Sequence, residues 1–287
     1  MNIPAAPALS RREFLQAAAV GLAAAPALLA ADDKKDDPFG GFILGVQSYT
    51  FREFDLEGAL KRTKDLGLKH GEFYQKHCPL NSNPEQLKAF QKLCKDYDVT
   101  PVAWGVQGFG KDHDANKRVF EFAKALGLKN ISADPTPDSF DSLDKLCEEY
   151  KVPIAIHPHG PGHRWNTADV ILKAVKDRNP LIGTCLDTGH LIRMAQINVK
   201  LDPAEEVRKM GARNFGMHLK DHDNKRKTDV VYGKDGGVLD VVAILKALRD
   251  VKFNGTISIE YEASPKEPTA DVKACVEVFK EAVKKLT

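Results

Sequence analysis

Several patterns that would identify a common class of protein are missing from this sequence. Its five cysteines stand singly, with no CxxC pair and an odd count, which argues against a disulfide framework and for small buried hydrophobes. A net charge of +2 gives no field that would favour nucleic acid or an acidic membrane as a partner. Neither GxGxxG nor GxxxxGK[ST] opens a helix, so the common nucleotide-binding fingerprints are absent.

The first thirty or so residues differ in composition from the rest of the chain. Ser10-Arg11-Arg12-Glu13-Phe14-Leu15 precedes an Ala/Leu-rich run from Gln16 to Ala31, a pattern that predicts a twin-arginine export signal. The apolar run is too short and too rich in alanine for a membrane span, so no stable membrane insertion is expected. An N-terminal amphipathic helix or membrane anchor is the alternative. We therefore expect a signal peptide over 1–31, a charged spacer over 32–38, one domain over 39–287, and a periplasmic location.

The expected domain has the composition and the periodicity of a folded α/β protein. Apolar residues make up 43% of the chain and charged residues 29%, which is enough apolar surface for a core. Eight apolar runs are expected to form strands: Phe42–Ser48, Lys69–Tyr74, Thr100–Val106, Asn130–Ala133, Val152–His157, Ile182–Asp187, Asn214–Leu219 and Thr256–Glu260. Between and after them lie amphipathic stretches of helical period: Leu56–Leu66, Pro84–Tyr97, Ala115–Leu126, Ser139–Tyr150, Thr167–Lys176, Pro203–Met210, Leu239–Leu248 and Thr269–Lys285.

Eight consecutive strand-helix units favour a closed (β/α)₈ TIM barrel. Open doubly wound sheets usually stop at about five to seven strands, so that architecture is the alternative. A weak internal repeat supports the alternation, because the segment 64–69 (KDLGLK) recurs as 124–129 (KALGLK), each ending a helix at a glycine and turning into a strand.

The polar residues collect where the expected strands end. In a barrel, catalytic groups project from the carboxyl ends of the strands. Four consecutive strands offer a metal-competent side chain there: His157, Asp187, His218 and Glu260. Asp, Glu and His together suit a divalent ion such as Mn²⁺, Mg²⁺, Co²⁺ or Zn²⁺. Each residue also has a simpler explanation, such as a structural histidine, a helix cap at Asp187 or a salt-bridged carboxylate at Glu260 beside Lys220.

The motifs at these strand ends resemble the sugar phosphate isomerase/epimerase family of the xylose isomerase-like superfamily. The resemblance is carried by Asp187-x-x-His190, by His218-x-Lys220-Asp221 and by the segment 259–262 (IEYE), together with the segments 45–51 (GVQSYTF) and 236–240 (GGVLD). It covers roughly Phe42 to Val283. The family includes ketose 3-epimerases, hydroxypyruvate isomerase and inosose dehydratase, and shares its fold with endonuclease IV.

The resemblance implies a single divalent metal held by Glu, Asp, His and Glu from strands five to eight. Asp187, His218 and Glu260 match three of these positions, whereas His157 stands where the epimerases have a glutamate. Glu260 is then the expected base that removes the proton next to a carbonyl, with His157 or His159 as the opposing acid. The missing second glutamate argues against simple 3-epimerisation and favours elimination or hydration of an oxidised sugar, so a secreted lyase or hydratase acting on 3-keto-glycosides is the alternative. Because an exported enzyme meets few sugar phosphates, a neutral sugar or glycoside is expected.

Other rim residues are candidates for contacts with a carbohydrate substrate. The expected contacts are His190, Lys220, Arg164, Trp104 and Glu72, and Tyr49, Phe51, Trp165 and His77 are further candidates for the pocket wall. A metal-free barrel that only binds a carbohydrate is the main competing hypothesis, because His157 departs from the family pattern. Cleavage of DNA, as in the endonuclease branch, is not expected. It would need further His and Glu metal ligands on the early strands and a basic surface, and the sequence shows neither. A homo-oligomer is compatible with the sequence.

Overall fold

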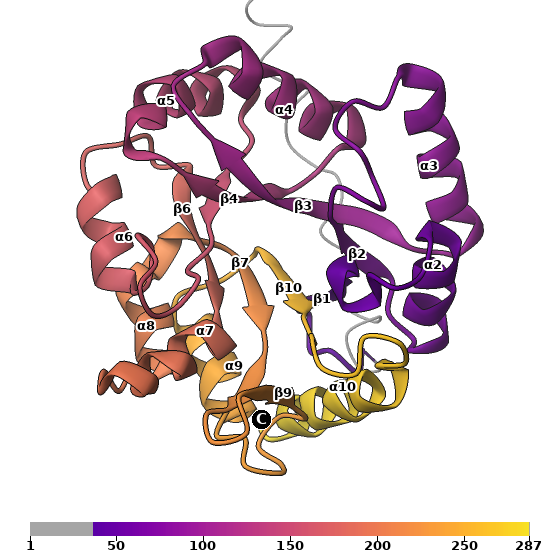
Figure 1. Cartoon of the computed structure of the whole chain (residues 1–287), viewed down its shortest axis with the longest axis vertical. Coiled ribbons are helices and arrows are strands. Elements are labelled where there is room, and N and C mark those ends of the chain that lie inside the picture. The colour runs from indigo at the N-terminus through magenta and orange to yellow at the C-terminus, as the bar shows by residue number, and fades with distance from the viewer. Residues whose placement is uncertain (1–36, 287) are drawn as a thin grey trace, which may run out of the picture. The chain divides into compact units, whose positions relative to one another are not determined.

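The computed structural model describes residues 37–286, so the predicted signal peptide and most of the spacer lie outside the described residues. Eight parallel strands of this part of the chain close into a barrel in the order β1-β10-β7-β6-β5-β4-β3-β2 (Figure 1). They are β1 Ile43–Gln47, β2 His70–Phe73, β3 Thr100–Phe109, β4 Asn130–Pro135, β5 Ile154–Ile156, β6 Ile182–Asp187, β7 Asn214–Leu219 and β10 Thr256–Ile259. The closed ring confirms the predicted TIM barrel and excludes the doubly wound sheet.

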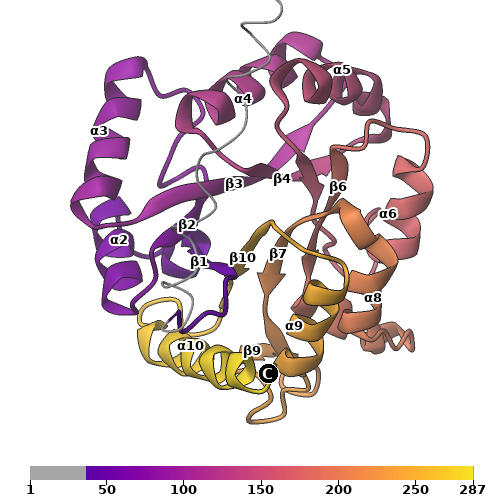
Figure 2. The same ribbon diagram turned by 180° about the vertical axis from the view of Figure 1, so that it is seen from behind.

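Helices surround the ring of strands (Figures 1 and 2). The longer ones are α2 Leu56–Asp65, α3 Pro84–Asp96, α4 His113–Leu126, α5 Phe140–Tyr150, α6 Ala168–Val175, α8 Pro203–Met210, α9 Val241–Asp250 and α10 Thr269–Lys284, with a short α7 at Thr188–Arg193. Local signals set their bounds: Asn83 and Gln86 form a capping box at the start of α3, and α4 ends at Gly127 in the left-handed conformation. Within residues 37–286, no helix has the length and apolarity needed to cross a membrane.

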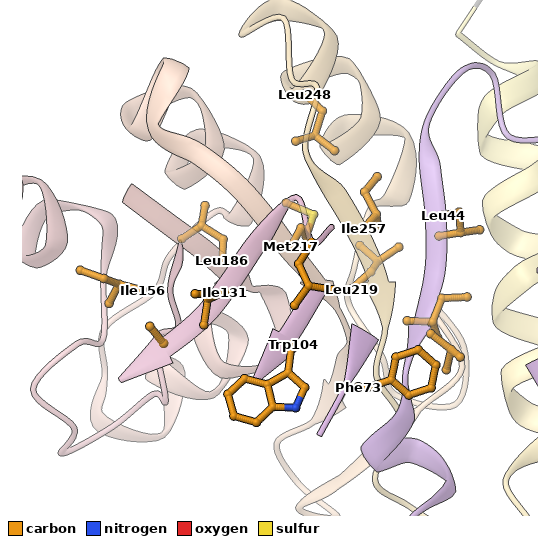
Figure 3. Packing of buried hydrophobic residues seen from close by; sticks show 14 of the residues in the cluster. Leu44, Phe73, Trp104, Ile131, Ile156, Leu186, Met217, Leu219, Leu248 and Ile257 are labelled. Atoms are coloured by element: carbon orange, nitrogen blue, oxygen red, sulfur yellow. The ribbon is translucent and has the colours of Figure 1, made fainter. Parts of the chain in front are cut away.

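Apolar strand residues face outward and pack beneath the helices. Figure 3 shows strand residues such as Met217, Leu219 and Ile257 gathered with Leu248 of helix α9. The five cysteines are all buried, as expected, and burial raises the pKa of Cys78, Cys94, Cys147 and Cys275 to about 12, so these thiols stay protonated at neutral pH.

The inside of the barrel is polar. Asn130 of β4 donates hydrogen bonds to the Phe215 carbonyl and to Thr256 Oγ1, on strands β7 and β10. These strands are not neighbours of β4 in the ring, so the contacts cross the interior of the barrel. Likewise Glu72 of β2 reaches His218 of β7 and Ser258 of β10. The functional rim is therefore supported from below by a buried hydrogen-bonded layer rather than by aliphatic side chains.

A small hairpin follows β7 that the sequence pattern does not predict. Strands β8 Asp221–Asp223 and β9 Thr228–Val230 pair antiparallel beside the barrel. Asp221 is 1% exposed and accepts four backbone N–H bonds, from His222, Gly233, Val238 and Leu239, at 2.8–3.1 Å. A Cβ at Gly237 would lie 2.3 Å from Asp221 Oδ2, so only glycine allows this approach. The carboxylate of Asp221 thus holds the loop that leads into helix α9.

We predict that Asp221→Ala lowers the free energy of unfolding by about 3–5 kcal/mol, because it leaves several buried N–H groups without an acceptor. Asp250→Ala is the control, since Asp250 is exposed and forms an exposed ion pair with Arg208, and should cost at most about 1 kcal/mol. Chemical denaturation followed by circular dichroism measures both. Equal stabilities of the two variants would show that Asp221 does not hold the loop.

Candidate metal centre and active site

The four candidate ligands come together at one end of the barrel. His157 directly follows β5, Asp187 ends β6, His218 lies in β7 and Glu260 directly follows β10, and these four strands are consecutive in the ring. One ligand atom from each residue lies within 4.8 Å of those of the other three, and all four residues are buried. The sequence-predicted set is thus one cluster in space.

His218 is the centre of this cluster. Its Nδ1 lies 3.0 Å from Nε2 of His157 and 3.1 Å from Oε2 of Glu260, while its Nε2 lies 3.0 Å from Oε2 of Glu72. Burial alone lowers the pKa of His218, but its neighbours Cys185, Glu72 and Glu260 raise it well above the usual value. A bound cation would take the place of the proton on Nδ1, whereas Nε2 would keep its proton and donate it in a hydrogen bond to Glu72.

This position corrects the prediction that Glu72 contacts substrate. The side chain is 1% exposed and lies beneath the cluster, where its Oε2 also accepts a hydrogen bond from Ser258 Oγ at 2.7 Å. Glu72 therefore positions His218, in the way that carboxylates orient metal-ligating histidines from behind.

Lys220 supplies a built-in positive charge to the cluster. Its buried Nζ lies 3.3 Å from Oδ2 of Asp187, 2.8 Å from Oε2 of Glu260 and 2.6 Å from Oε1 of Glu262. Burial by itself raises the pKa of Asp187 and Glu260, but Lys220, with the nearby histidines, holds the pKa of both carboxyls well below the usual range. Both carboxylates are therefore ionised at neutral pH. Lys220 was predicted to contact the substrate. Its ammonium group instead pairs with these carboxylates, and the residue does not line the pocket.

The donor set fits a divalent metal ion. Asp187 Oδ1 accepts a hydrogen bond from the backbone N–H of His190 and so caps helix α7, as the simpler explanation of this residue expects. Its Oδ2 is buried and faces the cluster, 3.3 Å from Lys220 Nζ and 3.4 Å from His157 Nε2, but makes no well-aligned hydrogen bond within residues 37–286. Two imidazoles and two carboxylates are donors that Mn²⁺, Co²⁺, Zn²⁺ and, less readily, Mg²⁺ accept.

A cavity of about 430 Å³ lies over the cluster, within the size range of small-molecule sites. Its wall is formed by Gln47, Tyr49, Tyr74, Gln75, Gly105, Val106, His157, His159, His190, Arg193, Glu260 and Glu262. Gly105 is needed in this wall, because its φ is +154° and a Cβ there would lie 2.3 Å from the Ser132 carbonyl oxygen. A wider hollow of about 870 Å³ over helices α9 and α10 contains none of the candidate ligands.

Two histidines of the pocket wall stay neutral. Burial lowers the pKa of both His159 and His190 to about 3. Their ring centroids lie 4.5 Å and 5.5 Å from that of His157. A neutral imidazole at neutral pH donates one hydrogen bond and accepts another, which suits contacts with a sugar carbonyl or hydroxyl.

Some predicted contacts lie elsewhere. Trp104 is 1% exposed, donates its Nε1–H to the Cys78 carbonyl and packs on Phe122 of α4, so its assignment to the substrate site is wrong. The strand turns this side chain outward, and the register of β3 against β4 shifts after Trp104. Arg164 also lies outside the pocket wall, with Nε 3.7 Å from Oδ1 of Asp134. Three further candidates for the wall are also buried elsewhere. Phe51 packs in the core, while Trp165 and His77 form hydrogen bonds with the Pro135 and Phe54 carbonyls.

Sequence reasoning missed several residues of the wall. Gln47 ends β1 and Tyr74 directly follows β2, so the same strand-end rule would have found both. Glu262 lies two residues beyond Glu260. Arg193 belongs to the unpredicted helix α7, and no pattern in the sequence marks it.

Comparison with known proteins identifies a family and several relatives of this chain. Residues 60–282 match the family model described as "Xylose isomerase-like TIM barrel". The chain is 24% identical over 239 residues to inosose isomerase of Bacillus velezensis, which covers 70% of this chain and 82% of that protein. It is 26% identical over 176 residues to the C-glycoside deglycosidase alpha subunit of Arthrobacter globiformis, covering 51% of this chain and 47% of that one. A match to a protein of Methanocaldococcus jannaschii likewise spans less than half of that relative, at 45%.

Solved structures share the fold. A protein of Parabacteroides distasonis superimposes with a TM-score of 0.66 at 28% identity, covering 86% of this chain and all of that one. An L-ribulose 3-epimerase gives a TM-score of 0.63 at 18% identity, covering 85% and 96% of the two chains. The 3-keto-D-glucoside 4-epimerase of E. coli gives 0.61 at 17% identity, covering 85% and 98%.

Proposed function

The chain belongs to the xylose isomerase-like TIM barrel family, and from this premise we propose that it is a sugar isomerase or epimerase that removes a proton next to a carbonyl group. The observation that supports this most directly is the convergence of His157, Asp187, His218 and Glu260 beneath a sugar-sized cavity. The names of the relatives, an inosose isomerase and sugar epimerases, point to the same class of substrate.

We propose further that these four residues hold one divalent ion. When bound, the ion supplies a Lewis acid toward the carbonyl and the adjacent hydroxyl of the substrate. The chain's own contribution is to fix the four donors: Glu72 holds His218, and the α7 backbone holds Asp187.

Glu260 is the proposed base. It is ionised, lies in the pocket wall and presents its carboxylate at the floor of the cavity. The ion pair with Lys220 keeps it ionised but also weakens it as a base. A weak base suffices here, because the proton next to a polarised carbonyl is acidified.

The proposed acid is a histidine of the opposite wall. His157 directs Nε2 at Asp187 and His218, which favours ligation over the acid role that the sequence also allowed. His159 and His190 remain, and a neutral imidazole can donate its hydrogen bond to a developing oxygen anion.

One observation favours a second candidate, a lyase or hydratase acting on 3-keto-glycosides by the same proton abstraction. Among the described residues, the carboxylates of the pocket wall are Glu260 and Glu262, which both follow strand β10. Epimerisation with two carboxylate bases needs one on each face of the substrate. A single base on one face, with histidines opposite, instead suits isomerisation, elimination or hydration. Relatives named for C-glycoside and keto-glucoside chemistry support this candidate.

The test is proton exchange in D₂O. The protein, loaded in turn with Mn²⁺, Co²⁺ and Zn²⁺, is incubated with a panel of ketoses, inososes and 3-keto-glycosides and followed by ¹H NMR. We expect at least one sugar to lose its α-proton signal, and a chelator to stop the loss. Binding of a sugar without exchange in any metal form would instead identify a carbohydrate-binding barrel.

We also propose export of the protein through the twin-arginine route, based on the pattern of residues 1–31.

Glu72→Gln is expected to weaken metal binding about 10- to 100-fold, because the neutral amide no longer stabilises the orientation and basicity of His218. Glu206→Gln is the matched control: Glu206 is a carboxylate of helix α8 that is 2% exposed and bonds to Lys209, away from the pocket. Competition with a chromophoric chelator measures both affinities. An unchanged affinity in Glu72→Gln would remove its proposed role behind His218.

A further inference from the structure

A second group of metal-competent side chains lies beside the first. We propose that Asp134, His159 and His163 form a separate divalent cation site at the rim of the barrel. Asp134 lies near the end of β4, and the two histidines lie in the loop between β5 and α6. One donor atom from each residue lies within 4.8 Å of those of the other two. This site goes beyond the function proposed above, which needs only the first cluster.

The three side chains are arranged around a common point. His163 Nε2 lies 3.4 Å from Oδ2 of Asp134, and the rings of His159 and His163 have centroids 4.5 Å apart. His163 is fixed from behind, because its Nδ1 lies 3.3 Å from both the backbone nitrogen and the backbone oxygen of Trp165. The other ring nitrogen, Nε2, therefore faces Asp134.

Unsatisfied polar atoms point to a missing partner. Asp134 Oδ1 and His159 Nδ1 are both buried, and neither has a hydrogen-bond partner among residues 37–286. Buried polar groups are normally paired, and two orphaned atoms in a cluster of three side chains need an explanation. The side chains of Asp134 and His163 are 26% and 25% exposed, so an ion has a path from solvent.

Within residues 37–286, Arg164 is the arginine or lysine that forms an ion pair with Asp134. Its Nε lies 3.7 Å from Oδ1 of Asp134, beyond hydrogen-bond distance, and its side chain is 41% exposed. The guanidinium thus attracts Asp134 without a hydrogen bond to it, and its Nη1 instead donates to the Pro135 carbonyl oxygen at 3.4 Å. Such an exposed pair contributes little, so it does not outcompete a divalent ion.

The donor types indicate which ion is held. Two imidazoles and one carboxylate are the three protein ligands of one kind of catalytic Zn²⁺ site, and Co²⁺ substitutes readily at such donors. A fourth position of such an ion would be open to water or to an oxygen of the substrate. Because His159 also lines the sugar cavity, the second ion would border it, and His190 would then be left as the acid.

The experiment counts ions in four forms of the full chain. The parent, Asp187→Asn, His163→Ala and the control His113→Ala are reconstituted with Zn²⁺ and weighed by native mass spectrometry. We expect two ions in the parent and in His113→Ala, but one in each of the other two variants. His113 is a suitable control because its ring contacts Ser142, away from both clusters.

The possible outcomes separate this proposal from the proposed function. One ion in the parent, lost in Asp187→Asn and kept in His163→Ala, overturns the second site and leaves the first intact. One ion lost only in His163→Ala supports the second site and removes the metal from the proposed function. Two ions that persist in His163→Ala, or no ion in the parent, overturn the second site.

Discussion

Glu260→Gln is expected to slow α-proton exchange by about 10²- to 10⁴-fold, the usual contribution of a positioned base. The amide occupies nearly the same volume but neither accepts the proton nor carries the charge that Lys220 pairs with. The barrel should stay folded, because Lys220 keeps Asp187 and Glu262 as partners. The rate is measured by ¹H NMR in D₂O at saturating metal, on whichever sugar the parent exchanges.

Glu262→Gln is the matched control for this change. Glu262 follows the same strand, lines the same cavity and also bonds to Lys220, at 2.6 Å, but it is not part of the ligand cluster. It should keep exchange within about tenfold of the parent rate, since it only orients or binds. If Glu262→Gln lost more activity than Glu260→Gln, the base would have to be reassigned to Glu262.

Asp187→Asn is expected to weaken metal binding by at least about 100-fold, because loss of an outer-shell partner alone costs 10- to 100-fold and Asp187 is a proposed direct ligand. Asparagine is as good a helix N-cap as aspartate, so the cap on helix α7 is retained. Metal affinity is measured by chelator competition, and folding by thermal denaturation.

Asp240→Asn is the control for this substitution. Asp240 caps helix α9 through the backbone N–H of Ala243, so the same chemical change is made at the same helical position, outside the cluster. Its metal affinity should equal that of the parent. Similar affinities for the parent and Asp187→Asn would place the metal, if there is one, outside this cluster.

The fold was largely predictable because apolar runs and helix signals repeat along the chain. Strands β6 and β7 have the predicted bounds, because Asp187 ends one apolar run and Lys220 directly follows the other. The hairpin β8–β9 was missed for the opposite reason: it is built from polar residues such as Asp221 and Asp229, whose burial depends on hydrogen bonds rather than on apolar periodicity. Strand β3 runs on to Phe109, beyond the predicted end at Val106.

The candidate ligands were predictable, but the roles of their neighbours were not. Parallel strands end at one rim, so strand-end Asp, His and Glu residues were expected to meet. Which way a side chain points depends on the strand register, and register shifts occur between Gly71 and Glu72 and after Trp104. Trp104 points outward from β3, whereas Glu72 points into the barrel but lies beneath the cluster, so its depth rather than its direction was misjudged. The contact of Lys220 with three carboxylates depends on the packing of β6, β7 and β10, which no local pattern encodes.

Metal content per chain, determined by elemental mass spectrometry on the purified protein, decides whether the cluster of His157, Asp187, His218 and Glu260 is a metal centre. We expect at least one divalent ion per chain, as purified or after incubation with Mn²⁺, Co²⁺ or Zn²⁺, held in part by His157 and His218. A protein that takes up no ion under any of these conditions would contradict this expectation. Lys220 would then be the cation of the cluster, and the barrel would be a carbohydrate-binding protein.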